Sequence, residues 1–473
     1  MEKIKKSKSG IKGFDAITNG GLPSGRPSLV CGTAGSGKTL FGINFIVSGI
    51  REFNEPGVII SFEERVDDLV ANVESMGWDL RKHIDEKKLM IDYIYVERSE
   101  IEETGYYNLD GLFIRIASAV KVTGAKRILI DTLESLFSGF TNEQLLRAEI
   151  RRLFKWLKDK GLTAVITAEA GNNTLTRYGL EEYLSDFVLL LKTTTNHNVT
   201  TRSLRLIKYR GSDHEIDEYP FLINSSGFSV LPLSDVSFDY EVTDKRVPTG
   251  IGKLDDMLGN KGLYNSSILL ISGTPGSGKT LLAASILEAA CKRGEKVIYI
   301  SFEESRRQLL RNFKSAGINV EKWIEKDLFR FGNFRPTSTG IESHLITMID
   351  MMEDEKPAKV VIDPVSSWAG INLAPESRSM VLRILHYIQS IGITCILTEM
   401  TSTGKPEESP MNLTSMVDAW FYLQLSEVDG SRKKILNIIK VRGLNHSDRQ
   451  RELIISEKGI DLVDLPPGAR NDV

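Results

Sequence analysis

The chain has 473 residues, of which 41% are hydrophobic and 26% charged, and its formal net charge at pH 7 is −3. These values describe an ordinary soluble globular protein that is long enough for more than one domain. No apolar run approaches the ~18 residues that a membrane span needs. The acidic balance offers no electrostatic basis for wrapping nucleic acid.

The N-terminal segment, Met1–Lys8, is basic but lacks the apolar stretch of a secretion signal. The three cysteines, Cys31, Cys291 and Cys395, are odd in number and far apart, and none belongs to a C-x-x-C motif. Both features are typical of a cytoplasmic protein, in which thiols stay reduced. The six histidines show no zinc-type spacing.

A phosphate-loop pattern, G-x-x-x-x-G-K-[ST], occurs twice, as Gly32–Thr39 and Gly273–Thr280. An apolar run precedes each loop and a helical pattern follows it, which is the context that this motif requires. Glycines let the main chain close around a phosphate, and the N–H groups of the loop and helix start supply partial positive charge.

We therefore predict two ATP sites that use Mg²⁺. The loop lysines would reach the β- and γ-phosphates, and Thr39 and Thr280 would ligate the metal ion. The predicted nucleotide-binding residues of the loops are Gly32, Thr33, Ala34, Gly35, Ser36, Gly37, Lys38, Thr39 and Leu40, and Gly273, Thr274, Pro275, Gly276, Ser277, Gly278, Lys279, Thr280 and Leu281.

The loops belong to a repeat that covers most of the chain. The recurring pairs are Val58–Glu64 with Val297–Glu304, Arg127–Asp131 with Lys359–Asp363, and Lys208–His214 with Lys440–His446. The offset between matching residues of the two copies is smaller at the second pair than at the first, so the first copy must contain a longer loop between them. We place this loop at Glu97–Asn108. The predicted organisation is a first domain over residues 1–233, a linker over 234–247, a second domain over 248–461 and a tail over 462–473.

Apolar strands alternate with amphipathic helices, such as Glu143–Lys158 and Ser377–Ile391. This alternation predicts an α/β fold with a mostly parallel, twisted sheet flanked by helices in each domain. Alternating β-type sequence follows each parallel core, at Ser203–Lys208 and Lys434–Lys440. We expect these segments to form antiparallel edge strands.

Asp131 and Asp363 each end an apolar strand. A carboxylate at this place holds Mg²⁺ through water in phosphate-loop enzymes, so we assign both residues to the nucleotide sites. The alternative is an aspartate that merely caps a turn.

The glutamate pairs Glu63-Glu64 and Glu303-Glu304 end the strand that we place next to the phosphate loop. A carboxylate there can take a proton from an attacking water or hydroxyl group. The alternative is an acidic pair that stabilises a helix N-terminus. We predict at least one catalytic glutamate in each pair, and we also assign Glu303 to the metal site.

Lys208 and Arg210, like Lys440 and Arg442, are two residues apart in β-type sequence, so each pair points to one face. Two such cations can clamp a γ-phosphate, in the same chain or in a neighbour. Solvated charges on an edge strand are the alternative, but the K-x-R-G-x-x-H pattern recurs in both copies. The predicted nucleotide-binding set of these segments is Lys208, Arg210, Ser212, His214, Lys440, Arg442 and His446.

Together these motifs resemble the KaiC family of RecA-like ATPases, over essentially the whole chain from Ile11 to Asp461. The most specific matches are Gly20–Pro23, the two Ser-Phe-Glu-Glu strands, Tyr178–Tyr183 and Glu303–Arg306. The resemblance implies two tandem RecA-like P-loop NTPase domains in a hexamer of stacked rings, with ATP bound between subunits. The cations of K-x-R-G would then act on the nucleotide of the neighbouring subunit. In the family the first ring is a slow ATPase, and the second transfers phosphate to its own Ser and Thr and back.

The family's phosphorylated Ser-Thr pair precedes an aspartate that opens an apolar strand. Here Asp418 opens such a strand, and the matching pair is Thr414-Ser415, in reversed order. Glu182 and Tyr183 occupy the equivalent positions of the first copy. The resemblance thus implies that the second domain is an autokinase with Thr414 or Ser415 as phosphoacceptor. A turn-capping role for both hydroxyls is the alternative.

In this scheme Glu303 deprotonates the acceptor hydroxyl, and Glu63 or Glu64 activates water in the first domain. Two residues depart from the family: Pro364 replaces a hydroxyl residue after Asp363, and Gly370 stands where the family has an arginine.

The resemblance also bears on partners. The long C-terminal segment to which the family's activator KaiA docks is largely missing, so no KaiA partner is expected. Glu97–Asn108 lies where the family recruits KaiB, which makes a KaiB-like partner plausible. Two other functions stay open: a RecA-type DNA-dependent motor, which the acidic charge disfavours, and an ATP-gated scaffold without kinase activity, which the intact glutamate pairs disfavour.

Overall fold

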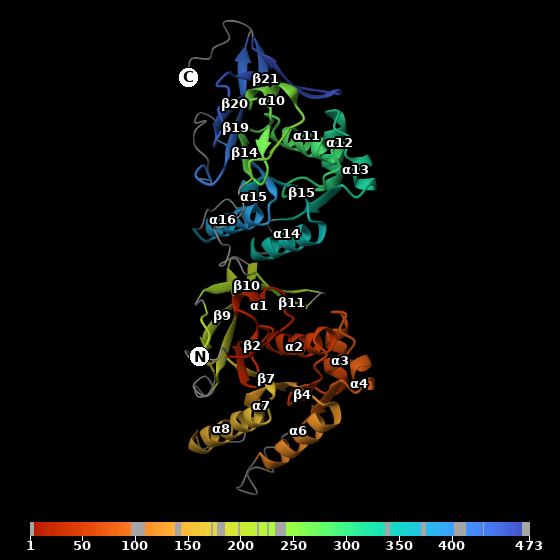
Figure 1. The fold of residues 1–473 in the computed structure, drawn as a ribbon, viewed down its shortest axis with the longest axis vertical. Helices are drawn as coiled ribbons and strands as arrows, with labels where there is room; N and C mark the ends of the chain where they lie inside the picture. Colours follow the sequence, from red (N-terminus) through yellow and green to blue (C-terminus); the bar gives the residue numbers. More distant parts are fainter. Residues whose placement is uncertain are drawn as a thin grey trace. The chain divides into compact units, whose positions relative to one another are not determined.

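The computed structural model describes residues 4–95, 109–137, 143–171, 174–176, 185–196, 199–214, 217–224, 227–231, 243–335, 341–369, 375–401, 413–428 and 430–465. The chain divides into two compact units, Met1–Asp235 and Val236–Val473 (Figure 1). No helix in these ranges combines the length and apolar character that crossing a membrane requires.

In the first unit, nine of the described strands form one sheet. They are β3 (Pro27–Gly32), β4 (Gly57–Ser61), β5 (Leu89–Tyr93), β6 (Arg127–Asp131), β7 (Thr163–Glu169), β8 (Phe187–Asn196), β9 (Val199–Tyr209), β10 (Glu218–Asn224) and β11 (Gly227–Val230). Their order is β11-β10-β9-β8-β3-β7-β6-β4-β5. The strands from β8 to β5 are parallel, and β9 to β11 continue the sheet in antiparallel fashion.

Helices cover both faces of this sheet (Figure 1). One face packs against α1 (Phe14–Ile17), α2 (Lys38–Glu52), α3 (Val66–Glu74) and α4 (Leu80–Asp85). The other face packs against α6 (Asp110–Thr123), α7 (Leu133–Phe137) and α8 (Glu143–Asp159). A short two-stranded antiparallel sheet of β1 (Lys6–Ser7) and β2 (Leu22–Pro23), with α1 between its strands, precedes β3.

Alternation along the strands explains the two layers of helices. On β4, Ile59 faces one hydrophobic cluster, while Val58 and Ile60 face the other. Because successive side chains of a strand point to opposite faces, a strand covered on both faces has a continuous apolar sequence.

The second unit repeats this design. Its described strands are β12 (Arg246–Val247), β13 (Leu263–Tyr264), β14 (Ile268–Gly273), β15 (Val297–Ser301), β16 (Phe329–Asn333), β17 (Lys359–Asp363), β18 (Thr394–Met400), β19 (Ala419–Val428), β20 (Ser431–Val441), β21 (Arg451–Ser456) and β22 (Gly459–Asp464). The order of its large sheet is β16-β15-β17-β18-β14-β19-β20-β21-β22, with the strands from β16 to β19 parallel.

The helices of the second unit also lie in two layers (Figure 1). Its main hydrophobic cluster includes α10 (Gly252–Met257), α11 (Lys279–Lys292) and α12 (Arg306–Ser315), with α13 (Glu321–Glu325) beside it. On the opposite face, α15 (Val365–Ala369) and α16 (Pro375–Ser390) contact β18, and α14 (Ile341–Glu355) packs on α16. The predicted α/β class with two RecA-like domains is confirmed.

Three details differ from the predictions. The glutamate pairs do not follow the strand next to the phosphate loop, because β7 and β6 lie between β3 and β4. Residues 203–208 and 434–440 are antiparallel as predicted, but β11 and β22 are the outermost strands. Arg246-Val247, placed in the predicted linker, pairs with β13, and β22 runs past residue 461 to Asp464 because it pairs with β21.

Candidate functional site

The two phosphate loops connect the central parallel strand of each sheet to the helix that follows it. Gly37 and Gly278 stand at the helix starts with φ angles of 98° and 102°, and neither helix has a side-chain cap. A left-handed φ is available to glycine without steric cost. The first N–H groups of α2 and α11 are therefore left for an external acceptor.

The lysines of both loops are buried and lie across them. The Lys38 ammonium donates to the carbonyl oxygens of Gly32 (2.9 Å) and Thr33 (3.0 Å). Lys279 makes the same two contacts in the second loop, each at 2.9 Å. Burial lowers the pKa of Lys279, while the charges of Asp363 and Glu303 act in the opposite direction. Both carboxylates thus lie close enough to influence the second loop.

The loops fit a triphosphate by a direct test. Ser36 and Ser277 have buried hydroxyl groups for which the described residues supply no hydrogen-bond partner. Gly35 and Gly276 have open space where a Cβ atom would stand. Unpaired buried polar groups are costly unless a ligand or water satisfies them, so an anion in the loop accounts for both features.

The metal-binding residues predicted for the first loop meet at the carboxyl edge of the sheet. The Thr39 hydroxyl donates to one oxygen of Asp131 at 2.9 Å, and Thr167 of β7 donates to the other. Burial raises the pKa of the Asp131 carboxyl, and both hydroxyl groups oppose this rise. A hydroxyl and a carboxylate side by side form an oxygen-rich site of the kind that Mg²⁺ prefers.

The second loop has the same arrangement with one addition. Thr280 donates to Asp363 at 2.9 Å and Thr398 donates to its other oxygen. The hydroxyl group of Tyr299 also donates to Asp363. The peptide bond after the aspartate is cis in both units, although Thr132 follows Asp131 and Pro364 follows Asp363.

The first glutamate of each pair faces the segment that follows this aspartate. Glu63 accepts hydrogen bonds from the hydroxyl groups of Thr132 (2.9 Å) and Ser135 (2.8 Å). Glu303 accepts one from Ser367. Both glutamates are exposed, so their carboxylates are open to a reactant.

The second glutamate of each pair is held by the following helix. Glu64 accepts from the amide of Asn72 on α3 at 3.0 Å, and Glu304 from Asn312 on α12 at 2.7 Å. Burial and the charge of Asp363 raise the pKa of Glu304, while the Asn312 hydrogen bond opposes this rise. The structure thus gives the two glutamates of a pair different surroundings, which sequence did not distinguish.

The K-x-R-G segments and the phosphate loops lie at opposite ends of the parallel strands. Lys208 pairs with Val188 near the start of β8, and Lys440 pairs with Trp420 near the start of β19. Both positions are at the amino ends of the parallel strands, whereas the phosphate loops follow their carboxyl ends. From sequence, these cations could serve a nucleotide site of the same chain or of a neighbour, and within one chain the structure separates them from the loops.

The predicted phosphoacceptors lie in a turn before β19. The Lys440 ammonium donates to the carbonyl oxygens of Thr414 (2.8 Å) and Val417 (3.0 Å), and Arg442 donates to that of Ser415. The Ser415 side chain is exposed. The turn is therefore fixed through its main chain and leaves the Ser415 hydroxyl available.

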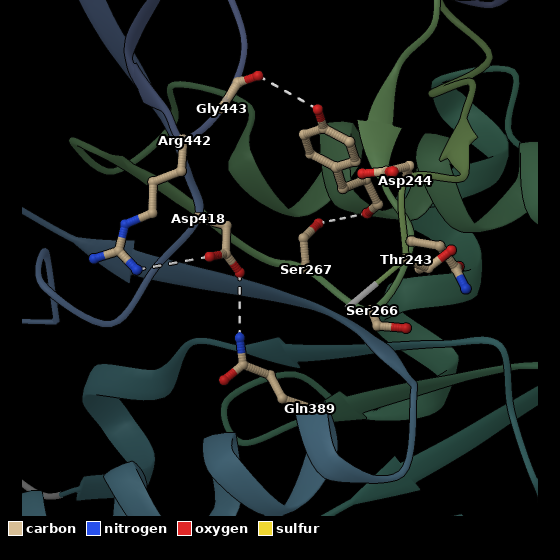
Figure 2. Close-up of a pocket in the computed structure, with 10 residues that line it drawn as sticks. Thr243, Asp244, Ser266, Ser267, Gln389, Asp418, Arg442 and Gly443 are labelled. Atoms are coloured by element: carbon tan, nitrogen blue, oxygen red, sulfur yellow. Dashed lines mark hydrogen bonds and ion pairs between the residues drawn. The ribbon is translucent and has the colours of Figure 1, made fainter. Parts of the chain in front are cut away.

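Asp418 ends this turn, and Figure 2 shows the side chains around it in the second unit. It lies between Arg442, at 3.8 Å, and the Gln389 amide, at 3.2 Å, beside a cavity of about 330 Å³. Its counterpart Asp186 faces three cations at 3.3 to 3.5 Å, namely Arg26, Lys158 and Arg210. In the second unit Ser267 and Gln389 stand in place of Arg26 and Lys158, so only the arginine of K-x-R-G is shared.

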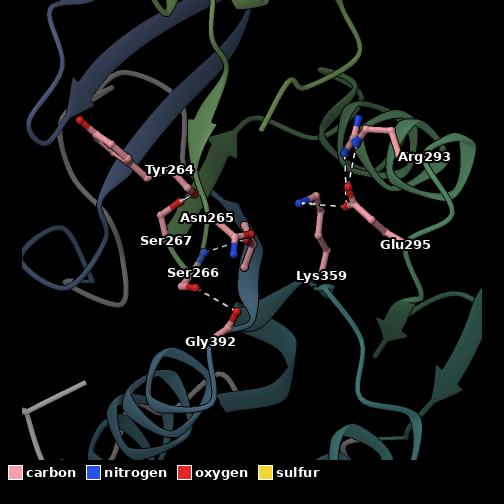
Figure 3. A network of polar contacts seen from close by, with 9 residues as sticks. Tyr264, Asn265, Ser266, Ser267, Arg293, Glu295, Lys359 and Gly392 are labelled. Carbon is pink, nitrogen blue, oxygen red and sulfur yellow. Dashed lines mark hydrogen bonds and ion pairs between the residues drawn. The ribbon is translucent and has the colours of Figure 1, made fainter. Parts of the chain in front are cut away.

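Polar contacts tie the amino ends of the second sheet together (Figure 3). Ser266 donates its hydroxyl to the Gly392 carbonyl at 2.9 Å, which joins the start of β14 to the start of β18. Lys359 of β17 is buried and lies 3.4 Å from Glu295, which Arg293 also contacts at 2.7 Å. The acceptor turn reaches the same end of the sheet, where the N–H of Asp418 donates to the carbonyl oxygen of Ile268 at 2.9 Å.

The remaining predicted residues have other surroundings. Leu40 and Leu281 lie in the first turns of α2 and α11 and pack against the hydrophobic clusters. Ser212 accepts from Lys6 at 2.7 Å, and His446 lies 3.8 Å from Asp448. His214 is half-buried. Three predicted segments lie outside the described residues: 97–108, 178–183 (which includes Glu182 and Tyr183) and Gly370.

Sequence reasoning missed several partners of the site. Thr167 and Thr398 occupy matching positions of two apolar strands, β7 and β18, and this repetition is the signal that could have found them. Asn72 and Asn312 recur eight residues after the second glutamate of each pair (Glu64 to Asn72, Glu304 to Asn312). Tyr299 has no such signal, because Ile59 occupies its place in the first copy.

Comparisons with known proteins agree with this architecture. The family model of the KaiC ATPase matches residues 7–235 and 247–466. The chain is 46% identical over 462 residues to the circadian clock protein KaiC2 of Synechocystis, which covers 97% of this chain and 81% of that protein. It is 37% identical over 465 residues to the circadian clock oscillator protein KaiC of Synechococcus elongatus, with 98% and 89% covered. Because the family match extends over both units and the identities over nearly the whole chain, this protein belongs to the KaiC family of ATPases.

Proposed function

We propose that the protein is an Mg²⁺- and ATP-dependent ATPase and autophosphorylating Ser/Thr kinase that works as a hexamer with nucleotide between subunits. The first unit would hydrolyse ATP. The second would transfer phosphate to Thr414 or Ser415 and, as in the family, back again.

One observation carries this proposal: the loop and the acceptor turn of the second unit lie at opposite ends of β14. The loop follows Gly273, whereas the N–H of Asp418, which ends the turn, donates to the carbonyl of Ile268 at 2.9 Å. At a rise of ~3.3 Å per residue, the six residues of β14 separate the two edges by roughly 17 Å. Phosphoryl transfer needs contact between acceptor and γ-phosphate, so the loop of one subunit must serve the turn of another.

The same geometry supports the predicted cation clamp. Lys440 and Arg442 lie beside the turn, far from the loop of their own chain. A neighbouring subunit that presents its loop to the turn would meet acceptor and clamp together. Positioning and charge neutralisation supply most of the rate in phosphoryl transfer, so such a divided site can be active only when assembled.

The chemistry assigns one task to each residue. Glu303 accepts the hydroxyl proton of Thr414 or Ser415. The acceptor's hydroxyl oxygen forms a bond to the γ-phosphorus while the bond between that phosphorus and the oxygen of the leaving ADP breaks. Lys279 and the clamp of the neighbour bind the phosphate oxygens. When bound at Thr280 and Asp363, Mg²⁺ supplies charge neutralisation. Glu304, held by Asn312, would keep the strand end in place.

In the first unit the same parts would activate water. Glu63, fixed by Thr132 and Ser135, is the proposed base, and Lys38, Thr39 and Asp131 are the proposed nucleotide and metal residues. Lys208 and Arg210 would complete a neighbour's site. The segment 97–108 stays a proposed contact for a KaiB-like partner.

Mass spectrometry after incubation with Mg-ATP tests the proposal. Phosphate should appear within residues 411–415 of the assembled protein. Hydrolysis of ATP without any phosphate on this segment would overturn the kinase part. ATP turnover that rises on addition of DNA would instead favour a DNA-dependent motor.

A further inference from the structure

The two nucleotide sites differ at a fully buried tyrosine. Tyr299 lies on β15 with no exposed surface, and its hydroxyl group donates to the same oxygen of Asp363 that accepts from Thr280. Asp363 pairs with Ser301, two residues further along β15, so Tyr299 and Asp363 lie on the same face of the sheet. Three hydroxyl groups, including that of Thr398, therefore donate to this carboxylate.

The first unit lacks this contact although its backbone is the same. Asp131 pairs with Ser61, and the residue two positions before Ser61 is Ile59. Ile59 has no polar atom to offer. Among the described side chains, Asp131 accepts from Thr39 and Thr167 in the positions of Thr280 and Thr398.

Neighbouring rings fix the position of Tyr299. Its ring packs edge-on against Phe313, at 5.4 Å between centroids, and lies 5.9 Å from Phe331 and 6.4 Å from Phe329. The first unit has aliphatic residues at these places, namely Val73, Ile91 and Leu89. Because close packing restricts rotation of the ring, the phenol hydroxyl is held in one place.

We propose that Tyr299 is a positioning residue of the second nucleotide site, which orients the Asp363 carboxylate for Mg²⁺ and so lets this site bind Mg-ATP at lower Mg²⁺ concentration. The inference rests on the proposed ATP site at the second loop. A carboxylate accepts only, so the phenol must donate its proton and can hold one oxygen of Asp363 while Thr280 turns to the metal ion. Hydrogen bonds of this kind behind a metal site raise metal affinity by about 10- to 100-fold.

The test measures binding of a fluorescent, non-hydrolysable ATP analogue to the full chain during a titration with MgCl₂ and again in EDTA. Lys38→Ala silences the first site in all samples. Tyr299→Phe keeps the ring and removes only the hydroxyl. We expect the Mg²⁺ concentration at half-maximal binding to rise by about tenfold, with the affinity in EDTA unchanged.

A matched control is Tyr387→Phe, which removes a phenol that donates to the Glu353 carboxylate at 2.9 Å between α16 and α14. It should titrate like the parent. If Tyr299→Phe does not fold, Tyr299→Met, whose smaller and flexible side chain also lacks a hydroxyl group, should give the same shift.

An unchanged Mg²⁺ titration for Tyr299→Phe would overturn the inference, and so would an equal loss of affinity with and without Mg²⁺, since that marks a structural role. If the parent binds the analogue equally well with Mg²⁺ and in EDTA, the inference fails while the ATP site stands. If the parent binds no analogue under either condition, the proposed second ATP site fails as well.

Discussion

The ammonium group of Lys440 lies 2.8 Å from the carbonyl oxygen of Thr414. One of the two cations proposed to bind a neighbour's γ-phosphate therefore also holds the main chain of the proposed acceptor turn. An ammonium group has three donors, so Lys440 can keep its two carbonyl partners and give the third donor to a phosphate. Hydrogen bonds thus join the clamp residue on β20 directly to the acceptor turn before β19.

Replacing Lys440 with Met should lower phosphate incorporation at residues 411–415 by at least about a hundredfold, since it removes a charge that stabilises the transferred group. ATP binding at the loop of the same chain should persist. Phosphopeptide quantification and nucleotide binding measure the two effects. Lys433→Met is the control, because Lys433 lies on the same strand but pairs with Glu452 at 3.0 Å. Equal loss of labelling in both variants would contradict a specific role for Lys440.

The glutamates should separate the activities of the two units. Glu303→Gln should reduce phosphate incorporation by about 10²- to 10⁴-fold and leave hydrolysis by the first unit, because the amide cannot accept the acceptor's proton. Glu63→Gln should reduce ATP hydrolysis by the first unit and leave phosphate incorporation in the second unit. Rates of ADP release and of phosphopeptide formation distinguish them.

Glu304→Gln is the matched test within the pair. Its carboxylate already accepts from Asn312, so the loss of labelling should be smaller than for Glu303→Gln. A larger loss for Glu304→Gln would assign the base to Glu304 instead.

His344 should make the second unit sensitive to acid. Its imidazole is 4% exposed and lies edge-on to the rings of Phe302 and Phe334. Burial lowers the pKa of His344 from its ordinary value of 6.5. The unfolded chain therefore takes up a proton that the folded chain does not, and stability falls as pH drops below 6.5 towards the lowered pKa.

His344→Phe keeps an aromatic ring and removes the titration. Its stability should be lower at neutral pH, since the variant loses a hydrogen bond to the Arg335 main chain. The further loss between about pH 7.5 and about pH 5.5 should be smaller than in the parent. Thermal unfolding at both values gives the comparison, and parallel pH profiles would count against the assignment.

Arg127 should be a major stabilising residue of the first unit. Its side chain is 1% exposed and donates to Glu55 (2.7 Å) and to the carbonyl oxygens of Phe45 and Lys8 (2.8 Å each). Arg127→Met removes a buried guanidinium group that hydrogen-bonds to a half-buried carboxylate and to two carbonyl oxygens, so the free energy of unfolding should fall by about 3–5 kcal/mol. Hydrogen exchange of the amides of β3 and β6 reports this loss.

Arg115→Met provides the comparison, because the Arg115–Asp92 pair is partly exposed and should contribute only about 0–1 kcal/mol. Similar exchange rates in the two variants would show that burial does not set the strength of these pairs.

Local sequence was sufficient for the loops, the strand-ending aspartates and the fold class. The conformation around Gly37 and Lys38 could be predicted locally, because a glycine-rich turn before a helix has few alternative main-chain conformations. Asp131 follows an apolar strand, so its place at the carboxyl edge could be read from the pattern. The family resemblance, confirmed by the comparisons, added the order of the two domains.

The remaining features depend on which strands become neighbours. Two strands enter between β3 and β4, and no local pattern encodes such a crossover. The contact of Thr167 with Asp131 depends on the pairing of β7 with β6, which only the assembled sheet supplies. The contact of Tyr299 with Asp363 could not be predicted for a further reason, because a tyrosine in an apolar strand is typical of a hydrophobic core.

Mixing two inactive variants tests most directly whether phosphate passes between subunits. Glu303→Gln keeps the acceptors but loses the proposed base, whereas the double variant Thr414→Ala, Ser415→Ala keeps the base but loses the acceptors. In the presence of Mg-ATP, the Glu303→Gln variant alone should incorporate phosphate at residues 411–415 about 10²- to 10⁴-fold less than the parent, and the double variant alone should incorporate none there.

In mixed assemblies, the intact loop of the double variant should phosphorylate the acceptors of its Glu303→Gln neighbour, and exchange of subunits is verified with isotope-labelled parent chains. The account predicts phosphate on Thr414 or Ser415 of the Glu303→Gln chain in the mixture. Verified exchange without any such phosphate would contradict transfer between subunits.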